Sequence, residues 1–190
     1  MEIPEDTWDA AQHAEYGYWV RRGTRGLGKD ARSRLLYFYE VPLSFAGKVV
    51  VEVGCGLGNF LRVITAKEKI GIEPLLDKFS EIFDMDVAGI QFIKGKGEKI
   101  PLPDDKADVV FCSNVLNHTS YPEMCLKEIR RIMKKGAVLY FDTHFDYQSV
   151  LHPHVFTRKS IRELLEAYFS IERVIDKEFK WGAICRWKKI

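Results

Sequence analysis

A glycine-rich turn directly after a short apolar run constrains the fold of this chain more than any other feature of its sequence. The run is residues 48–53, and the turn is Gly54-Cys55-Gly56-Leu57-Gly58. A short run of β-branched residues predicts a buried strand. Glycines permit unusual dihedral angles and close approach to a ligand, and a following helix would point its free N–H groups at the same place. The pattern predicts a strand, a ligand-binding turn and a helix to about Ala66.

Apolar runs alternate with helix-like segments along the rest of the chain, which indicates a parallel sheet with helices on both faces. Further strands are expected at 69–73, 90–94, 107–113 and 137–143. A closing pair at 171–178 and 183–189 is separated by a short turn and should pair antiparallel. The predicted fold class is α/β, a Rossmann-like seven-stranded mostly parallel sheet with helices on both faces and an antiparallel C-terminal hairpin strand. Ligands of such sheets lie beyond the carboxyl ends of the strands.

The helices between these strands have recognisable limits. After the second strand, Ile82 is expected to share the inner face of a helix with Phe79. Pro122 is expected near the start of the helix before the fifth strand, and Gly136 is expected to stop that helix. Thr157 is expected to cap the last helix.

The 190 residues are expected to form a single domain, 1–190, with residues 1–46 as a helical N-terminal extension or cap. Its first helix carries Trp8, Tyr18 and Trp19 on one face, and Asp30 is the expected N-cap of its second helix. Large aromatic side chains on one face must cover something. Two arrangements remain open, a brace on an outer helix of the core or a lid across the carboxyl edge of the sheet that forms part of a substrate pocket.

A carboxylate at the end of the second strand indicates what the turn binds. Glu73 can accept hydrogen bonds there from both hydroxyls of a ribose, although it would alternatively cap the helix that begins near Leu75. A nicotinamide or flavin site favours G-x-G-x-x-G, whereas this sequence has Asn59 at the third glycine position. We therefore expect a ribose-containing ligand and do not expect a nicotinamide oxidoreductase.

With these motifs in order, residues 50–143 resemble the class I S-adenosylmethionine-dependent methyltransferases, particularly their small-molecule branch. Residues 52–58 resemble the first motif of the family, residues 95–104 its adenine loop, and residues 113–118 the end of its fourth strand. The resemblance implies that S-adenosylmethionine is the cofactor. It also implies that the cofactor is held by Glu52, Gly54, Cys55, Gly56, Gly58, Glu73, Pro74, Gly97, Glu98, Ser113 and Asn114.

The adenine loop departs from the family pattern at Lys96, where many members carry an aspartate that accepts from the adenine amino group. A lysine ammonium offers donors only. We therefore expect Lys96 not to contact the adenine. Glu98, or the backbone of Gly97 and Glu98, would supply the acceptor instead.

Histidines are the candidate catalytic residues. His118 follows the fourth strand and His144 ends the fifth, so both should lie on the ligand-bearing edge, and either would serve as a base for an acceptor that must lose a proton. A purely structural hydrogen bond is the alternative for each. His152 and His154 flank a proline near His144, but their spacing gives no regular metal-ligand pattern, so no metal site is expected.

Net charge, cysteine spacing and one basic run bear on which partners the protein can have. The formal net charge is only +2, and the four cysteines show no paired metal-ligand spacing. The basic run 21–34 would suit an anionic partner such as RNA, although a solvated helix face and loop is the preferred explanation. The sequence thus predicts a methyltransferase for a small-molecule acceptor. A catalytically silent cofactor-binding module and an RNA methyltransferase remain as alternatives.

The first residues and the lengths of the apolar runs predict where in the cell the protein is located. The acidic start, residues 1–10, has no basic and apolar regions of a signal peptide, and no run approaches the roughly 20 apolar residues of a membrane helix. We expect a cytoplasmic protein with no membrane partner, and we do not expect a nucleic-acid partner.

Overall fold

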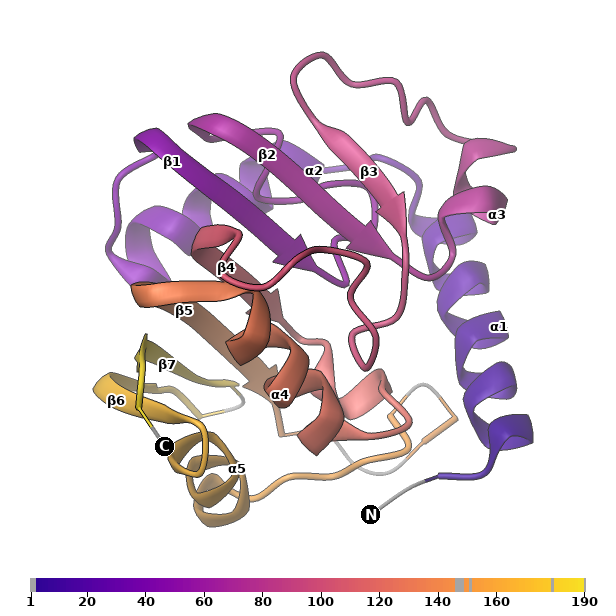
Figure 1. Ribbon diagram of the computed structural model, residues 1–190. Helices are drawn as coiled ribbons and strands as arrows, with labels where there is room; N and C mark the ends of the chain where they lie inside the picture. The colour runs from indigo at the N-terminus through magenta and orange to yellow at the C-terminus, as the bar shows by residue number, and fades with distance from the viewer. Residues whose placement is uncertain (1–2, 146–148, 151, 179, 190) are drawn as a thin grey trace.

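The computed structural model describes residues 3–145, 149–150, 152–178 and 180–189. Seven strands form one sheet in the order β3-β2-β1-β4-β5-β7-β6 (Figure 1). Strand β7 pairs antiparallel with both β5 and β6, whereas the pairs among β1 to β5 are parallel. The predicted fold class is confirmed. The strands are β1 Ser44–Val53, β2 Thr65–Glu73, β3 Gln91–Lys94, β4 Ala107–Ser113, β5 Met133–His144, β6 Phe169–Asp176 and β7 Lys180–Trp187.

Helices cover both faces of the sheet. One core cluster joins α4 and α5 to strand residues such as Val110 and Phe141. The other joins α2 and η1 to the opposite side chains, such as Phe111 and Tyr140. Successive side chains of β4 and β5 point to opposite faces of the sheet, which explains why helices pack on both faces. The helices are α1 Glu5–Arg22, α2 Leu27–Ser33, π-helical η1 Arg34–Tyr39, α3 Leu76–Ser80, 3₁₀-helical η2 Leu116–His118, α4 Pro122–Ile132 and α5 Arg158–Glu166.

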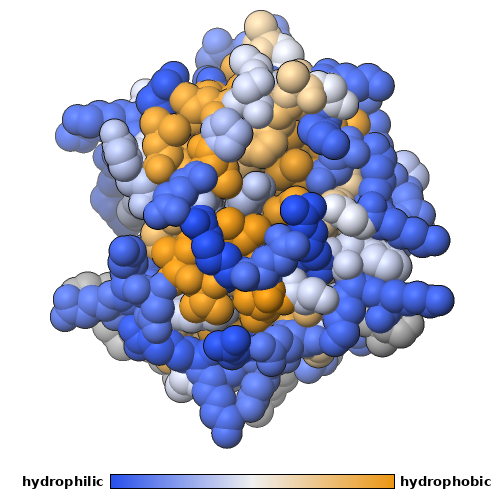
Figure 2. Space-filling model, turned by 90° about the vertical axis from the view of Figure 1, so that its left-hand side faces the viewer, coloured by the Kyte–Doolittle hydropathy of each residue, from blue (hydrophilic) through white to orange (hydrophobic). Residues whose placement is uncertain are grey.

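The face under α2 and η1 is the more open one. Figure 2 shows apolar surface, surrounded and crossed by hydrophilic side chains, on the side of the molecule that lies to the left in Figure 1. Val138, Ile175 and Ile184 pack against this cluster but stay only partly buried. On η1, Leu36 and Tyr37 are exposed. Two short helical elements thus shield this face less completely than α4 and α5 shield the other.

Helix α1 lies across the carboxyl ends of the first strands (Figure 1). Its Trp19 is buried in a third cluster with Leu57 of the glycine turn, Leu75 and Phe79. The Trp19 and Phe79 rings meet edge to face, with centroids 6.1 Å apart. Helix α1 thus packs on α3 and also lies over the carboxyl edge of the sheet, so both arrangements considered from the sequence remain open.

Two sequence predictions are wrong: the helix after the glycine turn and the N-cap at Asp30. The turn is not followed by a regular helix, because the N–H groups of Phe60 and Leu61 donate to the Glu52 carboxylate and β2 already begins at Thr65. Asp30 is not an N-cap. The chain turns with positive φ at Gly26, so α2 begins at Leu27, and Asp30 lies within that helix.

Two further helix limits differ from the expectation. Helix α3 ends at Ser80, so Ile82 is 47% exposed and does not share the inner face. Helix α4 ends at Ile132, and Gly136 does not stop it. Met133 instead pairs with Ala107 of β4. Sheet pairing ends this helix before its sequence signal does.

The expected cap at Thr157 is confirmed. The Thr157 side chain accepts from the Ser160 N–H at 3.0 Å, and the Ser160 hydroxyl accepts from the Thr157 N–H at 2.9 Å. This reciprocal capping box satisfies two donors that a helix start leaves without partners. Among the described residues, no helix is long and apolar enough to cross a membrane.

Candidate functional site

A cavity of about 390 Å³ lies between the glycine turn and α1, at the carboxyl edge of the sheet. Its size is within the roughly 300–1,000 Å³ typical of small-molecule pockets. Strand ends and the loops that follow them form one wall, and α1 forms the other. The wall contains most of the residues expected to hold the cofactor and both candidate catalytic histidines: Gly54, Gly56, Glu73, Pro74, Gly97, Glu98, Ser113, Asn114, His118 and His144.

Only glycine fits at Gly54 and Gly56, the first two glycines of the turn. Gly54 and Gly56 have φ of 63° and 54°, which side chains rarely tolerate. A Cβ at Gly54 would lie 2.6 Å from Val115, and one at Gly56 would lie 2.7 Å from the Trp19 ring. The turn therefore keeps its backbone open to the cavity while α1 packs directly over it.

The Glu73 carboxylate accepts hydrogen bonds from the backbone of the glycine turn and also faces the cavity. Its Oε2 accepts from the Gly56 N–H at 2.8 Å, and its Oε1 accepts from the Leu75 N–H at 3.0 Å. Each carboxylate oxygen retains a second lone pair. Burial raises the pKa of Glu73 to about 7, a rise that the two backbone donors reduce and the Glu15 charge increases. The Glu73 carboxylate thus holds the backbone of the glycine turn and of Leu75 while it lines the cavity in which a ribose is expected.

Three of the residues expected to hold the cofactor lie outside the cavity wall. Glu52 supports the turn from beneath, where it accepts from the Phe60 and Leu61 N–H groups, and burial raises its pKa to about 8. Cys55 is fully buried. Gly58 packs against Phe92, which a Cβ at Gly58 would approach to 2.9 Å. Their placement suits support of the turn rather than ligand contact.

The adenine loop meets both α1 and α4. Glu98 accepts from the N–H groups of Ser120 and Tyr121, at 2.6 and 3.2 Å, and so fixes the start of α4. The Lys96 ammonium lies 3.4 Å from the centroid of the Trp8 ring, a cation–π contact with α1. Lys96 therefore links the loop to α1.

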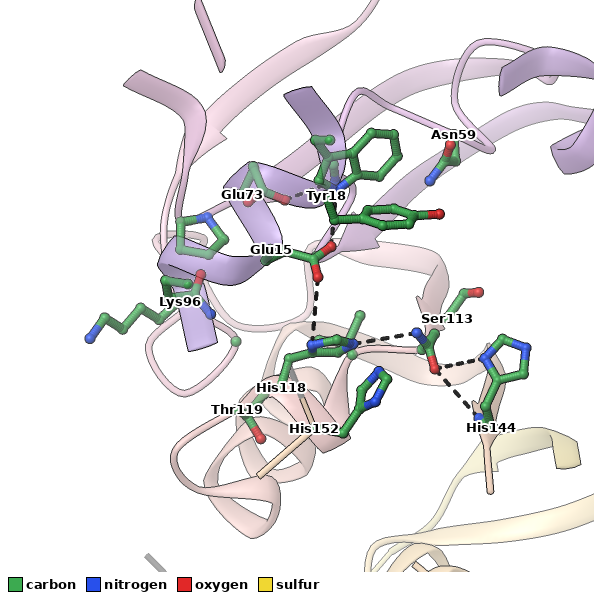
Figure 3. A pocket seen from close by; sticks show the side chains of 18 of the residues that line it. Glu15, Tyr18, Asn59, Glu73, Lys96, Ser113, His118, Thr119, His144 and His152 are labelled. Atoms are coloured by element: carbon green, nitrogen blue, oxygen red, sulfur yellow. Dashed lines mark hydrogen bonds and ion pairs between the residues drawn. The ribbon is translucent and has the colours of Figure 1, made fainter. Parts of the chain in front are cut away.

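A polar network connects the two candidate catalytic histidines (Figure 3). The Asn114 amide lies 3.3 Å from His118 Nε2 on one side and 3.0 Å from His144 Nδ1 on the other. His118 Nδ1 lies 3.8 Å from Glu15 Oε2 on α1, and the His152 ring centroid lies 4.7 Å from that of His118. Helix α1, the end of β4 and the end of β5 thus meet at one set of titratable groups.

Sequence reasoning missed Arg34 as a cavity residue. Its guanidinium donates to Ser113 Oγ at 2.5 Å and lies 4.0 Å from the fully buried Asp142. Although burial raises the pKa of Asp142, Lys180 and Arg34 hold it below the ordinary value. No local motif marks Arg34, because its role depends on how residues 1–46 fold back over β4 and β5.

Glu15 lies on the face of α1 that lines the cavity, together with Trp8, Tyr18 and Trp19, but it was not among the site residues expected from the sequence. The aromatic and acidic composition of that face was the available signal. His152 lines the cavity, whereas His154 is not part of its wall. Within the described part of the chain, no group of three or more metal-ligating side chains is suited to a metal ion.

Comparison with known proteins identifies the family. Residues 51–141 match a family model described as "Methyltransferase domain". The tRNA U34 carboxymethyltransferase of Campylobacter hominis is 29% identical over 136 residues, covering 67% of this chain and 46% of that enzyme. Human thiol S-methyltransferase TMT1B is 32% identical over 151 residues, covering 66% of this chain and 62% of that protein. The chain thus spans about half the length of the curated relatives it matches.

A solved structure extends the likeness to the whole fold. The Thermotoga maritima protein described as a SAM-dependent methyltransferase, possible histamine N-methyltransferase, superposes with a TM-score of 0.67. The match covers 96% of this chain and 100% of that chain at 20% identity, so it shows the fold. Residues 51–141 therefore form a methyltransferase domain, and the seven-stranded sheet gives the chain the fold of the class I S-adenosylmethionine-dependent methyltransferases.

Proposed function

We propose that the protein transfers a methyl group from S-adenosylmethionine to a small-molecule acceptor in the cavity under α1. One observation carries the proposal. The open glycine turn and the Glu73 carboxylate line the same cavity, and each carboxylate oxygen keeps a lone pair beyond its backbone bond. This combination fits a ribose with two hydroxyl donors. Bound S-adenosylmethionine would supply an activated methyl group on a sulfonium.

The residues of the chain would then have separate tasks. Gly54 and Gly56 let the ligand approach the backbone, and Glu73 accepts from the ribose hydroxyls. Gly97 and Glu98 border the adenine. His118 or His144 would take a proton from the acceptor when its nucleophilic atom carries one. Because a methyl transfer mainly requires positioning and exclusion of water, α1 contributes by closing the cavity.

Two residues of the basic run, Arg22 and Arg34, are engaged within the protein, whereas its other basic residues are exposed. Arg22 pairs with Asp30 at 2.8 Å, and Arg34 turns inward to Ser113 and Asp142. Neither arginine is therefore fully available to a phosphate backbone. Aromatic side chains of α1 also border the cavity, as in pockets for small molecules. The matched relatives methylate or modify different acceptors, so the acceptor class needs a direct experiment.

The experiment is a screen for release of S-adenosylhomocysteine with separate pools of amines, alcohols and phenols, thiols, carboxylic acids, and tRNA. We expect turnover with at least one small-molecule pool and none with tRNA. Turnover with tRNA alone would replace the proposal with the RNA methyltransferase alternative. Tight binding of S-adenosylhomocysteine without turnover in any pool would support the silent cofactor-binding module.

A further inference from the structure

We infer that Glu15 on α1 is a positioning residue for His118. Its carboxylate would hold the imidazole with the proton on Nδ1 and stabilise the imidazolium that forms when the acceptor loses a proton. The inference rests on the proposed function, which does not require a base, and it narrows the acceptor to molecules whose nucleophilic atom carries a proton. It also gives the N-terminal segment a part in the reaction beyond covering the cavity.

The first step of the argument is the orientation of the Asn114 amide. The backbone N–H of His144 lies 3.4 Å from Asn114 Oδ1. A backbone N–H can only donate, so the amide oxygen faces His144 and the amide nitrogen faces His118. That nitrogen lies 3.3 Å from His118 Nε2, which must therefore accept. The proton of neutral His118 consequently lies on Nδ1, an assignment that follows from the hydrogen-bond network.

The backbone at Asn114 supports a functional role for this orientation. Asn114 has φ of 56°, a left-handed conformation in which few residues other than glycine are found. Its N–H donates to the Asp142 carbonyl at 2.7 Å, which ties the residue to β5. Strained backbone of this kind is concentrated at functional sites. The conformation sends the amide between the two histidines.

Glu15 lies on the other side of the His118 ring (Figure 3). His118 Nδ1 and Glu15 Oε2 are 3.8 Å apart, within ion-pair range but beyond a hydrogen bond. Trp19 Nε1 donates to Glu15 Oε1 at 3.0 Å and so fixes the carboxylate. Catalytic hydrogen bonds are often long before substrate binds. The pair is therefore placed to tighten when α1 settles over a bound acceptor.

The chemistry assigns each group a role. The acceptor proton passes to His118 Nε2, the acceptor lone pair bonds to the methyl carbon, and the carbon–sulfur bond breaks with its electrons left on sulfur. The products are the methylated acceptor, S-adenosylhomocysteine and an imidazolium. The acceptor would displace the Asn114 amide from Nε2, where the 3.3 Å contact is long. A carboxylate beside Nδ1 stabilises the imidazolium, as in histidine-based triads.

Burial strengthens the effect of this carboxylate. Side-chain exposure is 14% for His118 and 25% for Glu15. Burial raises the pKa of Glu15, and the hydrogen bond from Trp19 partly opposes the rise. A positive imidazolium nearby favours the ionised carboxylate. The charge of Glu15 thus becomes most stable at the moment when His118 becomes charged.

The test combines spectroscopy with kinetics at pH 8.5. Two-bond ¹H–¹⁵N correlation spectra of the full chain, with His118 assigned by comparison with His118→Gln, report the tautomer without any acceptor. We expect the Nδ1–H form. The Nε2–H form as the main species would overturn the inference even if the protein is an active methyltransferase.

The kinetic arm uses Glu15→Gln, the conservative Glu15→Asp, and Asp9→Asn as a matched control at an exposed position on α1. With an acceptor from the screen, we expect kcat of Glu15→Gln to fall at least ~10-fold, since a base and its partner contribute up to 10²–10⁴-fold. Affinity for S-adenosylhomocysteine should stay within about twofold, and Glu15→Asp should recover part of kcat. Equal kcat for Glu15→Gln and Asp9→Asn, or parallel losses of kcat, affinity and thermal stability, would reduce Glu15 to a structural residue.

Discussion

Replacing Glu73 by glutamine tests the cofactor site most sharply. The carboxylate already accepts the Gly56 and Leu75 N–H groups at 2.8 and 3.0 Å, and one lone pair on each oxygen remains for a ribose hydroxyl. Glutamine keeps one acceptor oxygen and substitutes an NH₂ donor for the other. One ribose hydroxyl then meets a donor, and the other meets a neutral oxygen.

The expected loss follows from the strength of these bonds. A hydrogen bond to a charged group is worth ~1.5–3 kcal/mol. Since each 1.4 kcal/mol is tenfold in affinity, S-adenosylhomocysteine should bind Glu73→Gln roughly 10- to 100-fold more weakly at pH 8. The pKa of Glu73 adds a second signature. The ionised form binds, so affinity is complete above pH 7 and is lost as pH falls through the value of about 7. Wild-type affinity should fall about tenfold between pH 8 and pH 6.

Titration calorimetry with S-adenosylhomocysteine at pH 8 and pH 6 measures both effects. Glu68→Gln is the matched control, because Glu68 lies on the same strand and pairs with Lys106 away from the cavity. It should behave as wild type. Glu73→Gln should bind weakly at both pH values, with less than about a twofold change between them. Equal affinities of Glu73→Gln and Glu68→Gln at pH 8, or the same pH dependence in both, would refute the reasoning.

Three further predictions concern the loop, the last helix and α1. Lys96→Ala should bind S-adenosylhomocysteine within about twofold of wild type by calorimetry, because the ammonium lies on Trp8; a tenfold loss would show a ligand contact. Thr157→Ala should lower the free energy of unfolding by ~0.5–2 kcal/mol in urea titrations, since the capping box is lost; an unchanged midpoint would contradict that role. S-adenosylhomocysteine should slow tryptic cleavage within residues 21–29, since a lid belongs to the less stable part of a fold. Equal cleavage with and without ligand would argue for a brace.

Local patterns were sufficient to predict the number and the chain order of the strands and the cap of α5. The limits of β4 agree with the expected residues 107–113, where a short apolar run with β-branched residues is bounded by polar residues. At Thr157, the capping residue and its Ser160 partner lie within one helical turn. Structure that depends on neighbours in sequence was therefore predictable.

Tertiary contacts determined the helix limits and the site contacts that the sequence did not predict. The expected helix after Gly58 competes with the Glu52 carboxylate, which takes the N–H groups of Phe60 and Leu61. The pairing of Met133 with β4 likewise overrides the helix-stop signal at Gly136. Helix α1 brings Glu15 to His118, more than one hundred positions later, and periodicity alone cannot reveal that meeting.

The crystal structure of the protein with S-adenosylhomocysteine would test the central claim most directly. The account predicts one ligand in the cavity under α1, with its ribose hydroxyls on Glu73, its adenine beside Gly97 and Glu98, and its sulfur facing the His118 side of the cavity. A ligand bound elsewhere on the chain, or an empty cavity in crystals grown with saturating S-adenosylhomocysteine, would contradict it.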